Sequence, residues 1–268
     1  MNYRKTRGGI LAPDYRLRKP RSSCGITMFP MDHGASFTPS GAGATDPNFA
    51  SVVLLLHMDG TDASTTFTDN STSAKTMTAN GNAQIDTAQS QFGGASGLFD
   101  GTGDYLTTPD SADWDFGTGD FTVEMWIRPA NLTQRGVLVN HGFDSNDIFT
   151  LHLLFDLSRG ARCAINTGGL TQVDFEQGNN TGWSANTWYH VALVRFGNEW
   201  DIYRDGVSIA SVTDADGLGS YTGSLFIGID VNGSGNPYNG WIDDLRVTKG
   251  VARYTANFTP PTAAFPNS

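Results

Sequence analysis

Residues 119–129 read Gly-Asp-Phe-Thr-Val-Glu-Met-Trp-Ile-Arg-Pro, and this stretch decides the fold class. In an extended chain, successive side chains point to opposite faces, so residues two apart share a face. Phe121, Val123, Met125 and Ile127 therefore lie together on one apolar face. The proline that follows lacks a backbone N–H and ends the strand. The stretch predicts a β-strand that buries one face.

The same period of two recurs on both sides of this stretch. Residues 149–155 and 225–231 alternate in the same way, and residues 52–58 form a short apolar run. Two alternating runs within residues 200–211 flank Asp205-Gly206, a pair that tolerates positive φ and suits a two-residue hairpin turn. We find no segment of useful length with a helical period. Many short strands separated by polar turns predict an all-β fold, an antiparallel sandwich of two sheets.

The composition fits a folded β-domain. Of the 268 residues, 38% are hydrophobic and 16% are charged, which is enough apolar material for a core and excludes global disorder. The longest apolar run, residues 52–56, is far too short to cross a bilayer. Residues 1–30 contain no apolar stretch of the kind that a secretory signal needs. We therefore expect no membrane partner.

Charge divides the chain into two parts. Residues 1–48 carry seven Lys/Arg against three Asp, a net charge of +4. The remaining residues carry ten Lys/Arg against 24 Asp/Glu, a net charge of −14. Five prolines and a Gly-Ala-Gly-Ala run interrupt residues 1–48, so this segment lacks the periodicity to fold alone. We expect residues 1–48 to be an extended N-terminal arm and linker, and residues 49–268 to be one domain.

The arm carries more apolar residues than a solvated tail needs, and they are interleaved with basic ones. This composition favours a segment that becomes ordered against a partner protein. A plain disordered tail is the alternative, and nucleic-acid binding is a weaker one because apolar residues dilute the positive charges. The residues expected to anchor the arm to its partner are Arg4, Lys5, Arg7, Tyr15, Arg16, Leu17, Arg18, Lys19, Arg21 and Phe29.

Five blocks of the sequence, in order, resemble a known family. They are Leu-Phe-Asp-Gly-Thr-Gly-Asp-Tyr-Leu at 98–106, residues 119–128, Trp-Tyr-His-Val-Ala-Leu-Val-Arg at 188–195, Asp-Ile-Tyr-Arg-Asp-Gly at 201–206 and Trp-Ile-Asp-Asp-Leu-Arg-Val at 241–247. These blocks resemble the laminin-G-like, concanavalin-A-like jelly rolls, and the resemblance implies a two-sheet jelly roll over residues 49–268. It does not decide the function, because this superfamily includes lectins, glycan-binding modules, adhesion domains, glucanases and virion proteins.

A second resemblance concerns residues 247–261, Val-Thr-Lys-Gly-Val-Ala-Arg-Tyr-Thr-Ala-Asn-Phe-Thr-Pro-Pro, which look like the ending of such domains in virion proteins of tailed bacteriophages. It implies a non-enzymatic structural protein on the virion surface, a capsid decoration or a tail or fibre component, made in the host cytoplasm. Its partners would be coat or tail subunits, bound through the arm, and host-surface glycans. Assembly into a homo-oligomer stays open. The rival hypothesis is a carbohydrate-binding or adhesion module of a bacterial surface protein, which would need a route of export.

Glucanases of this superfamily carry three acidic residues on one strand, because two carboxylates must flank the glycosidic bond. In this chain Glu124 stands alone on its strand, and Asp174 with Glu176 forms a pair without a third member. We interpret all three as solvated residues on strand faces. The sequence thus predicts no catalytic residues, and glycan hydrolysis is the weakest hypothesis.

Asp243 carries the strongest chemical signal. Alternation places it on the same face as Leu245 and Val247, where a carboxylate needs hydrogen-bond donors or a cation. The first and last strands of such jelly rolls are commonly neighbours, which brings Asp59 near. A site at Asp59, Asp69 and Asp243 would suit Ca²⁺, which prefers carboxylate and carbonyl oxygens. The alternative is that Asp243 accepts backbone N–H groups or pairs with an arginine.

Aromatic side chains offer flat, apolar faces on which sugar rings can stack. Trp126, Trp183 and Tyr238 are the residues that we expect to provide such platforms for a glycan. The alternative is that the large aromatic residues fill the core of the sandwich, in which case loops at the sheet rims form the contact surface.

Overall fold

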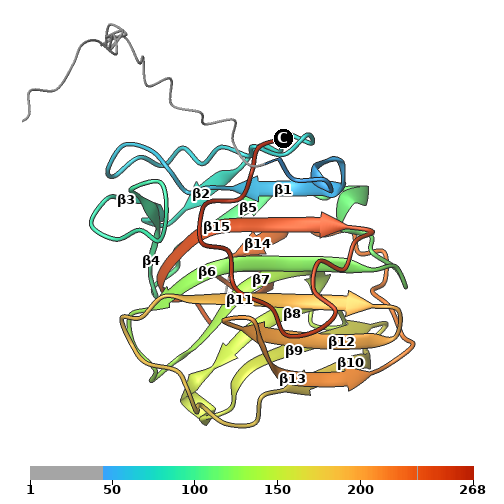
Figure 1. Ribbon diagram of the computed structural model, residues 1–268. Helices are drawn as coiled ribbons and strands as arrows, with labels where there is room; N and C mark the ends of the chain where they lie inside the picture. The colour runs from blue at the N-terminus through green and yellow to red at the C-terminus, as the bar shows by residue number, and fades with distance from the viewer. Residues whose placement is uncertain (1–44, 234) are drawn as a thin grey trace, which may run out of the picture. The chain divides into compact units, whose positions relative to one another are not determined.

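The computed structural model describes residues 45–233 and 235–268, which form two antiparallel β-sheets packed face to face (Figure 1). The predictions for residues 1–44, including all the anchor residues of the arm, lie outside the described residues. The eight-stranded sheet has the order β13 (Val207–Thr213), β12 (Glu199–Arg204), β11 (Tyr189–Phe196), β6 (Phe121–Pro129), β15 (Asn239–Lys249), β4 (Ser96–Asp100) and β3 (Gln84–Asp86), and β1 (Val52–Leu56) also pairs with β15.

The seven-stranded sheet has the order β10 (Leu170–Glu176), β9 (Gly160–Thr167), β8 (Asp147–Leu154), β7 (Arg135–Asp144), β14 (Leu225–Ile227), β5 (Tyr105–Thr108) and β2 (Thr78–Asn80). Helical structure in the described residues consists of the 3₁₀ turns η1 (Phe49–Ser51), η2 (Ala112–Trp114), η3 (Phe155–Leu157) and η4 (Val231–Gly233). None of the helices in this part of the chain is long and apolar enough to cross a membrane. The predicted all-β jelly-roll sandwich is confirmed.

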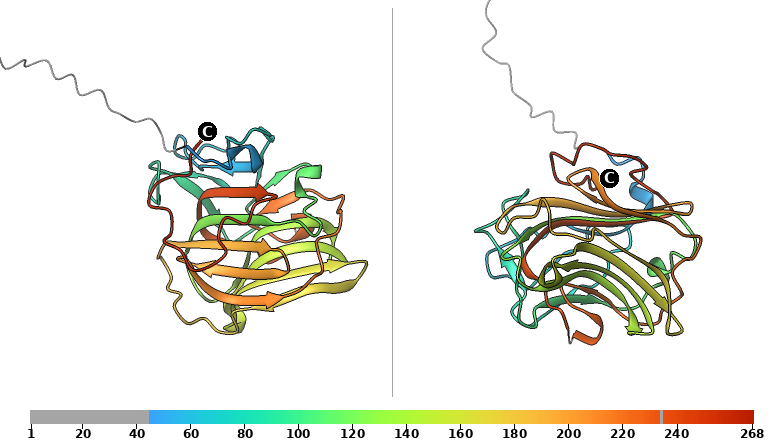
Figure 2. Two further views of the ribbon diagram at one scale, coloured as in Figure 1. Left: turned by 45° about the vertical axis from the view of Figure 1, so that its right-hand side comes forward. Right: turned by 90° about the horizontal axis from the view of Figure 1, so that it is seen from below.

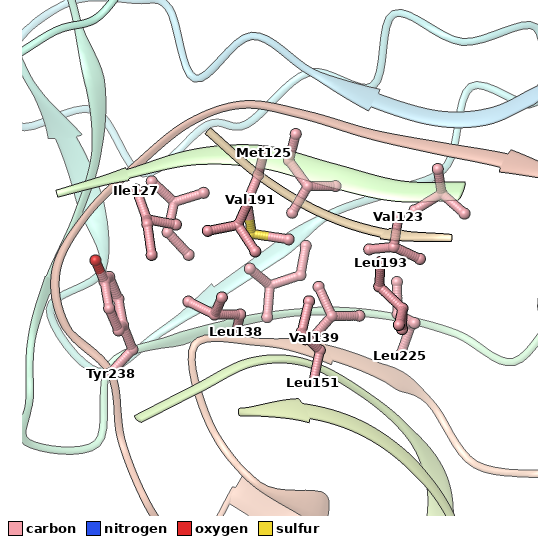
Figure 3. Packing of buried hydrophobic residues seen from close by; sticks show 14 of the residues in the cluster. Val123, Met125, Ile127, Leu138, Val139, Leu151, Val191, Leu193, Leu225 and Tyr238 are labelled. Carbon is pink, nitrogen blue, oxygen red and sulfur yellow. The ribbon is translucent and has the colours of Figure 1, made fainter. Parts of the chain in front are cut away.

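The core lies between the two sheets and follows the alternation seen in the sequence. Phe121, Val123, Met125 and Ile127 of β6 are at most 1% exposed and belong to this core. Full burial of one such side chain contributes roughly 1.5–3 kcal/mol. Figure 3 shows how side chains from both sheets meet there; its labelled residues are Val123, Met125, Ile127, Leu138, Val139, Leu151, Val191, Leu193, Leu225 and Tyr238.

The hairpin between β12 and β13 turns at Asp205-Gly206, as predicted. The two residues have φ values of 50° and 76°, and a two-residue turn of type I′ needs positive φ at both positions. Glycine is required at the second position because a Cβ there would lie 1.9 Å from the Phe258 carbonyl oxygen. The Phe258 N–H donates to the Gly206 carbonyl oxygen at 2.8 Å, so the turn also holds the C-terminal part of the chain.

The C-terminal segment, residues 250–268, lies over the outer face of the eight-stranded sheet (Figure 2, right-hand view). The rings of Tyr254 and Phe258 stack with planes 5° apart and pack against Tyr203 of β12. Farther along, Phe265 packs against residues of β1. The segment therefore adds a third layer to the sandwich on this side.

A buried ion network fills the space beneath the C-terminal segment. Glu124 of β6 is fully buried and accepts hydrogen bonds from Arg246 Nε and Nη2, at 2.9 and 2.7 Å, and from the Tyr254 hydroxyl at 2.7 Å. Burial alone would raise the pKa of Glu124, but Arg246, His190 and Tyr254 lower it to about 2. The prediction that Glu124 is solvated is wrong, because alternation within one strand cannot reveal that a distant segment covers its face.

Asp46 joins the beginning of the described chain to its end. Its carboxylate accepts hydrogen bonds from Arg246 at 3.1 Å and from Arg253 at 2.7 and 3.2 Å, and its N–H donates to the Ser268 backbone oxygen at 2.6 Å. Residue 45 therefore enters the sandwich on the outer side of the eight-stranded sheet. The predicted boundary between arm and domain lies between residues 48 and 49. Asp46 precedes this boundary and is nevertheless bonded to this sheet.

Candidate functional site

A hollow of about 220 Å³ opens on the outer face of the seven-stranded sheet. Strands β8 and β9 form its floor. Directly opposed residues on neighbouring antiparallel strands point to the same face, so both strands contribute side chains to it. The residues that alternate with the floor residues along these strands, such as Leu151, point into the core. The floor consists of three register pairs: Ile148 with Asn166, Thr150 with Ala164, and His152 with Arg162.

Asn140 of β7 supports one side of the hollow. Its side chain is fully buried, and its Nδ2 donates to Thr150 Oγ1 at 3.0 Å and to Asp230 Oδ1 at 3.1 Å. Its Oδ1 is buried and has no hydrogen-bond partner among the described residues. A buried acceptor without a donor costs roughly 1–3 kcal/mol. Asn140 itself does not line the hollow, so its part is to hold Thr150 and Asp230, which do.

The opposite side of the hollow holds an imidazole beside a guanidinium. Burial, together with the charges of Arg162 and Arg135, lowers the pKa of His152 to about 3, so this ring is neutral and carries one donor and one acceptor. Its Nδ1 is buried without a partner in the part of the chain that the structure describes. Arg162 is held in place by Asp174, through Nε and Nη2 contacts of 2.7 and 2.6 Å.

An aromatic pair lies on the same outer face of the sheet. Phe226 of β14 is in register with Asn140, and its neighbours Leu225 and Ile227 belong to the core. The Phe226 ring lies 6.0 Å from that of Tyr105 on β5, and both rings are partly exposed. Alternation of Phe226 with the apolar Leu225 and Ile227 is the signal in the sequence that marks it as an outward residue. The pair forms an apolar platform on this face, and neither ring lines the hollow.

The three aromatic residues expected to stack on a sugar lie elsewhere. Trp126, Trp183 and Tyr238 are 7%, 6% and 2% exposed. Trp183 and Tyr238 fill the core, and Trp126 lies on the outer face of the eight-stranded sheet, in contact with Phe92 and His190. None of the three reaches the hollow. Trp183 and Tyr238 therefore fit the alternative given above, that large aromatic residues fill the core, better than the expectation that they stack on a sugar.

Asp243 does not lie where alternation predicts. A bulge interrupts β15 after Asp243, and Asp244 has a φ of 48° there. A bulge adds one residue to a strand, which reverses the faces of the residues beyond it. Leu245 and Val247 therefore belong to the core, whereas Asp243 is in register with the outward-facing Trp126.

The Asp243 carboxylate is buried and only partly satisfied. Its Oδ2 accepts the N–H groups of Gln91 at 2.7 Å and Phe92 at 3.0 Å, whereas Oδ1 is buried without a partner among the described residues. Burial is the main cause that raises the pKa of Asp243 to about 7, and the charges of Asp244 and Asp59 add to it.

Asp59 lies close to the same loop. The first and last strands are neighbours as expected, since β1 pairs with β15, and Asp59 follows β1. A Cβ on Gly93 would fall 2.0 Å from Asp59 Oδ1, so this carboxylate lies against the backbone next to Phe92. Asp59 and Asp243 thus flank one loop, and the unsatisfied Oδ1 of Asp243 fits an oxygen ligand for a cation.

Asp69 does not fit as a third ligand. It accepts four hydrogen bonds, from the Ser71 hydroxyl and from the backbone N–H groups of Leu55, Ser71 and Lys75. These bonds fasten the turn at residues 69–75 and tie it to β1, so this carboxylate is engaged in holding the fold. Within residues 45–233 and 235–268, no group of three or more His, Cys, Asp or Glu is arranged to hold a metal ion. The Ca²⁺ site stays a prediction that rests on Asp59 and Asp243.

Several solved structures share this fold at low sequence identity. Domain 4 of AbnA, a GH43 extracellular arabinanase from Geobacillus stearothermophilus solved with arabinotriose, aligns with 75% of this chain and 94% of its own at 18% identity, with a TM-score of 0.56. The binding domain of Paraclostridial Mosquitocidal Protein 1 aligns with 76% of this chain at 15% identity (TM-score 0.57), and that of botulinum neurotoxin serotype D with 77% at 16% identity (TM-score 0.57). In both toxin structures the chain spans 50% of the matched chain.

These likenesses concern the fold alone, and no curated protein matches the sequence. A family model gives the more specific assignment. The model described as the concanavalin A-like lectin/glucanases superfamily matches residues 100–253, which include both strands of the hollow floor and the strands on either side of them. The chain belongs to the concanavalin A-like lectin/glucanases superfamily.

Proposed function

We propose that this protein is a non-enzymatic glycan-binding jelly roll displayed on the surface of a virion, with residues 1–48 as the anchor. The observation that carries the glycan-binding part is the hollow on β8 and β9, whose lining combines the neutral imidazole of His152, the Thr150 hydroxyl and the Arg162 guanidinium. Sugar rings have hydroxyl groups that donate and accept hydrogen bonds. The hollow offers partners for these groups.

The residues of the hollow favour binding over hydrolysis. A glycosidase needs two carboxyl groups on opposite sides of the bond that it breaks. Of the described residues that line the hollow, Asp230 is the one carboxylate. Its Oδ1 accepts from Asn140 Nδ2 and the Val231 N–H, and its Oδ2 accepts from Asn236 Nδ2. Such a carboxylate is engaged in holding the wall of the site. Release of reducing ends from polysaccharides would revive the enzyme hypothesis.

The two sheets of the sandwich support a division between attachment and recognition. Residue 45, which continues from the arm, enters on the outer side of the eight-stranded sheet, where Asp46 is bonded to Arg246 and Arg253. The hollow lies on the outer face of the other sheet. The described start of the chain and the hollow therefore lie on opposite sides of the sandwich.

The virion part of the proposal rests on the resemblance of residues 247–261 to the ends of phage virion domains and on the composition of the arm. The rival remains an adhesion module of a bacterial surface protein. Mass spectrometry of purified virions, with copy-number estimation, separates the two and also distinguishes a capsid protein from a tail protein. Absence of the protein from purified particles would favour the rival.

A glycan array probed with the full chain tests the glycan-binding part. The best ligand is then titrated against two variants, Arg162→Ala at the hollow and Arg159→Ala outside it, an arginine whose side chain is 52% exposed and pairs with Glu176. We expect the Arg162 variant to bind at least tenfold more weakly and the Arg159 variant to bind like the unmodified chain. If no glycan binds, the proposed function fails; if both variants bind equally well, the site lies elsewhere.

A further inference from the structure

We infer that the hollow selects uncharged sugar rings over sialylated or uronic-acid rings. This inference rests on the proposed function, because it names the class of glycan that the same site would take. It follows from how the charged groups around β8, β9 and β10 are paired, and from the charge of the whole domain.

The arginine at the hollow is already occupied by a carboxylate. Arg162 meets Asp174 of β10 through two parallel contacts, Nε to Oδ1 at 2.7 Å and Nη2 to Oδ2 at 2.6 Å. This is the two-pronged geometry with which a guanidinium recognises a carboxylate group. A sugar carboxylate could obtain the same contacts only by displacing Asp174. The guanidinium therefore presents its remaining N–H groups to neutral acceptors and offers no uncompensated charge.

Among the described residues, the other charged groups near the hollow are paired, apart from one carboxylate. Glu176, in register with Arg162, pairs with Arg159 at 3.3 Å, and Arg135 pairs with Asp156 at 3.1 Å. Asp230 lines the hollow and accepts hydrogen bonds from neutral groups. Across residues 45–268 there are ten Lys/Arg against 25 Asp/Glu. A carboxylate on the ligand would enter a field that repels it, whereas a neutral ring would not.

The remaining polar groups suit hydroxyls. The His152 ring is neutral and carries one donor and one acceptor, and the Thr150 hydroxyl can donate while it accepts from Asn140. Both residues line the hollow. A sugar hydroxyl both donates and accepts, so it can satisfy both groups, whereas a carboxylate only accepts and would leave the imidazole acceptor without a donor.

The test uses the full chain on an array that carries neutral oligosaccharides together with their sialylated and uronic-acid counterparts, followed by titration of matched pairs. We expect at least tenfold tighter binding of the neutral member. In Asp174→Asn, which frees the Arg162 guanidinium, we expect this ratio to fall at least tenfold because the acidic member gains affinity. The control Asp201→Asn, on the outer face of the other sheet, keeps the original ratio. Circular dichroism and melting curves establish that both variants are folded.

The outcomes separate this inference from the function on which it depends. Tighter binding of the acidic members by the unmodified chain overturns the inference and leaves glycan binding standing. An unchanged ratio in Asp174→Asn also overturns it, because the Arg162–Asp174 pair would then not be the selector. Binding of neither class removes the proposed function and the inference together.

Discussion

Arg246 of β15 and Glu124 of β6 form an ion pair with contacts of 2.9 and 2.7 Å, on a sheet face that the C-terminal segment covers. Both side chains are at most 6% exposed. A charge buried in this way depends on its partners, because water cannot solvate it. The C-terminal segment thus covers the outer face of the eight-stranded sheet at this pair, and the outer face of the seven-stranded sheet carries the hollow.

Glu124→Gln should destabilise the domain strongly. The substitution keeps the shape of the side chain but leaves Arg246 short of a counter-charge, and removal of one partner from a buried pair costs about 3–5 kcal/mol. The matched control is Glu199→Gln on β12, an exposed residue whose carboxylate meets the Thr213 hydroxyl. We expect it to change stability by less than ~0.5 kcal/mol. Urea unfolding of the three proteins measures the difference, and equal costs would contradict the account.

The stabilisation by Glu124 should disappear in acid. Its pKa is about 2 in the folded chain and 4.5 as its ordinary value, so the folded state favours the ionised form. A group whose pKa is lowered by folding stabilises the folded state fully at pH values above its pKa in the unfolded chain. This stabilisation is lost as the pH falls through its pKa in the folded chain. The free-energy gap between the unmodified chain and Glu124→Gln should be constant above pH 5 and shrink between about pH 4.5 and pH 2. A gap that does not depend on pH would show that packing, not charge, is responsible.

Two truncations should distinguish the arm from the sandwich. A chain that begins at residue 45 retains Asp46 and should unfold with the stability of the full chain. A chain that begins at residue 49 lacks Asp46, the partner of Arg246 and Arg253, and should lose about 3 kcal/mol or more. Thermal and urea unfolding give both values. Two truncated chains with identical stabilities would contradict the role of Asp46.

The chain that begins at residue 45 also tests the anchor. It should no longer join the virion, whereas residues 1–44 fused to an unrelated soluble protein should carry it onto particles that lack the native copy. Full occupancy of particles by the truncated chain would place the attachment surface on the jelly roll.

Calcium should raise the melting temperature through Asp59 and Asp243. A ligand that binds only the folded state stabilises it by about 2.7 kcal/mol at a hundred times its dissociation constant. The melting temperatures of Asp243→Asn and Asp59→Asn should be the same with chelator as with calcium. The control Asp69→Asn should lower the melting temperature both with chelator and with calcium, because it breaks the turn at residues 69–75. Calcium should still raise the melting temperature of this variant. An increase that survives in Asp243→Asn would contradict this site.

The sequence predicts the sandwich because its strands alternate cleanly. β6 and the Asp205-Gly206 turn could be placed by period and turn chemistry alone, since both depend on neighbours in sequence. β15 could not be placed in the same way, because the bulge at Asp244 changes its faces and nothing in the alternation marks it. The error about Asp243 follows from that one extra residue.

The candidate site was harder to predict than the fold. Asn140, Thr150, His152 and Arg162 come from three strands, and no motif in the sequence links the three stretches. Only the strand register brings them together. The burial of Glu124 was missed for a related reason, because the segment that covers it is more than a hundred residues away in sequence.

A bulky side chain that fills the hollow on β8 and β9 should abolish the binding of a glycan there. Ala164 lies on the floor of the hollow, so Ala164→Trp should occupy the space that a sugar ring needs. Ala185, an exposed residue outside the hollow, gives the matched control Ala185→Trp. Titration calorimetry with the best glycan from the array should show loss of binding in the first variant and unchanged affinity in the second, with both variants folded by circular dichroism. Unchanged affinity in a folded Ala164→Trp would contradict the account.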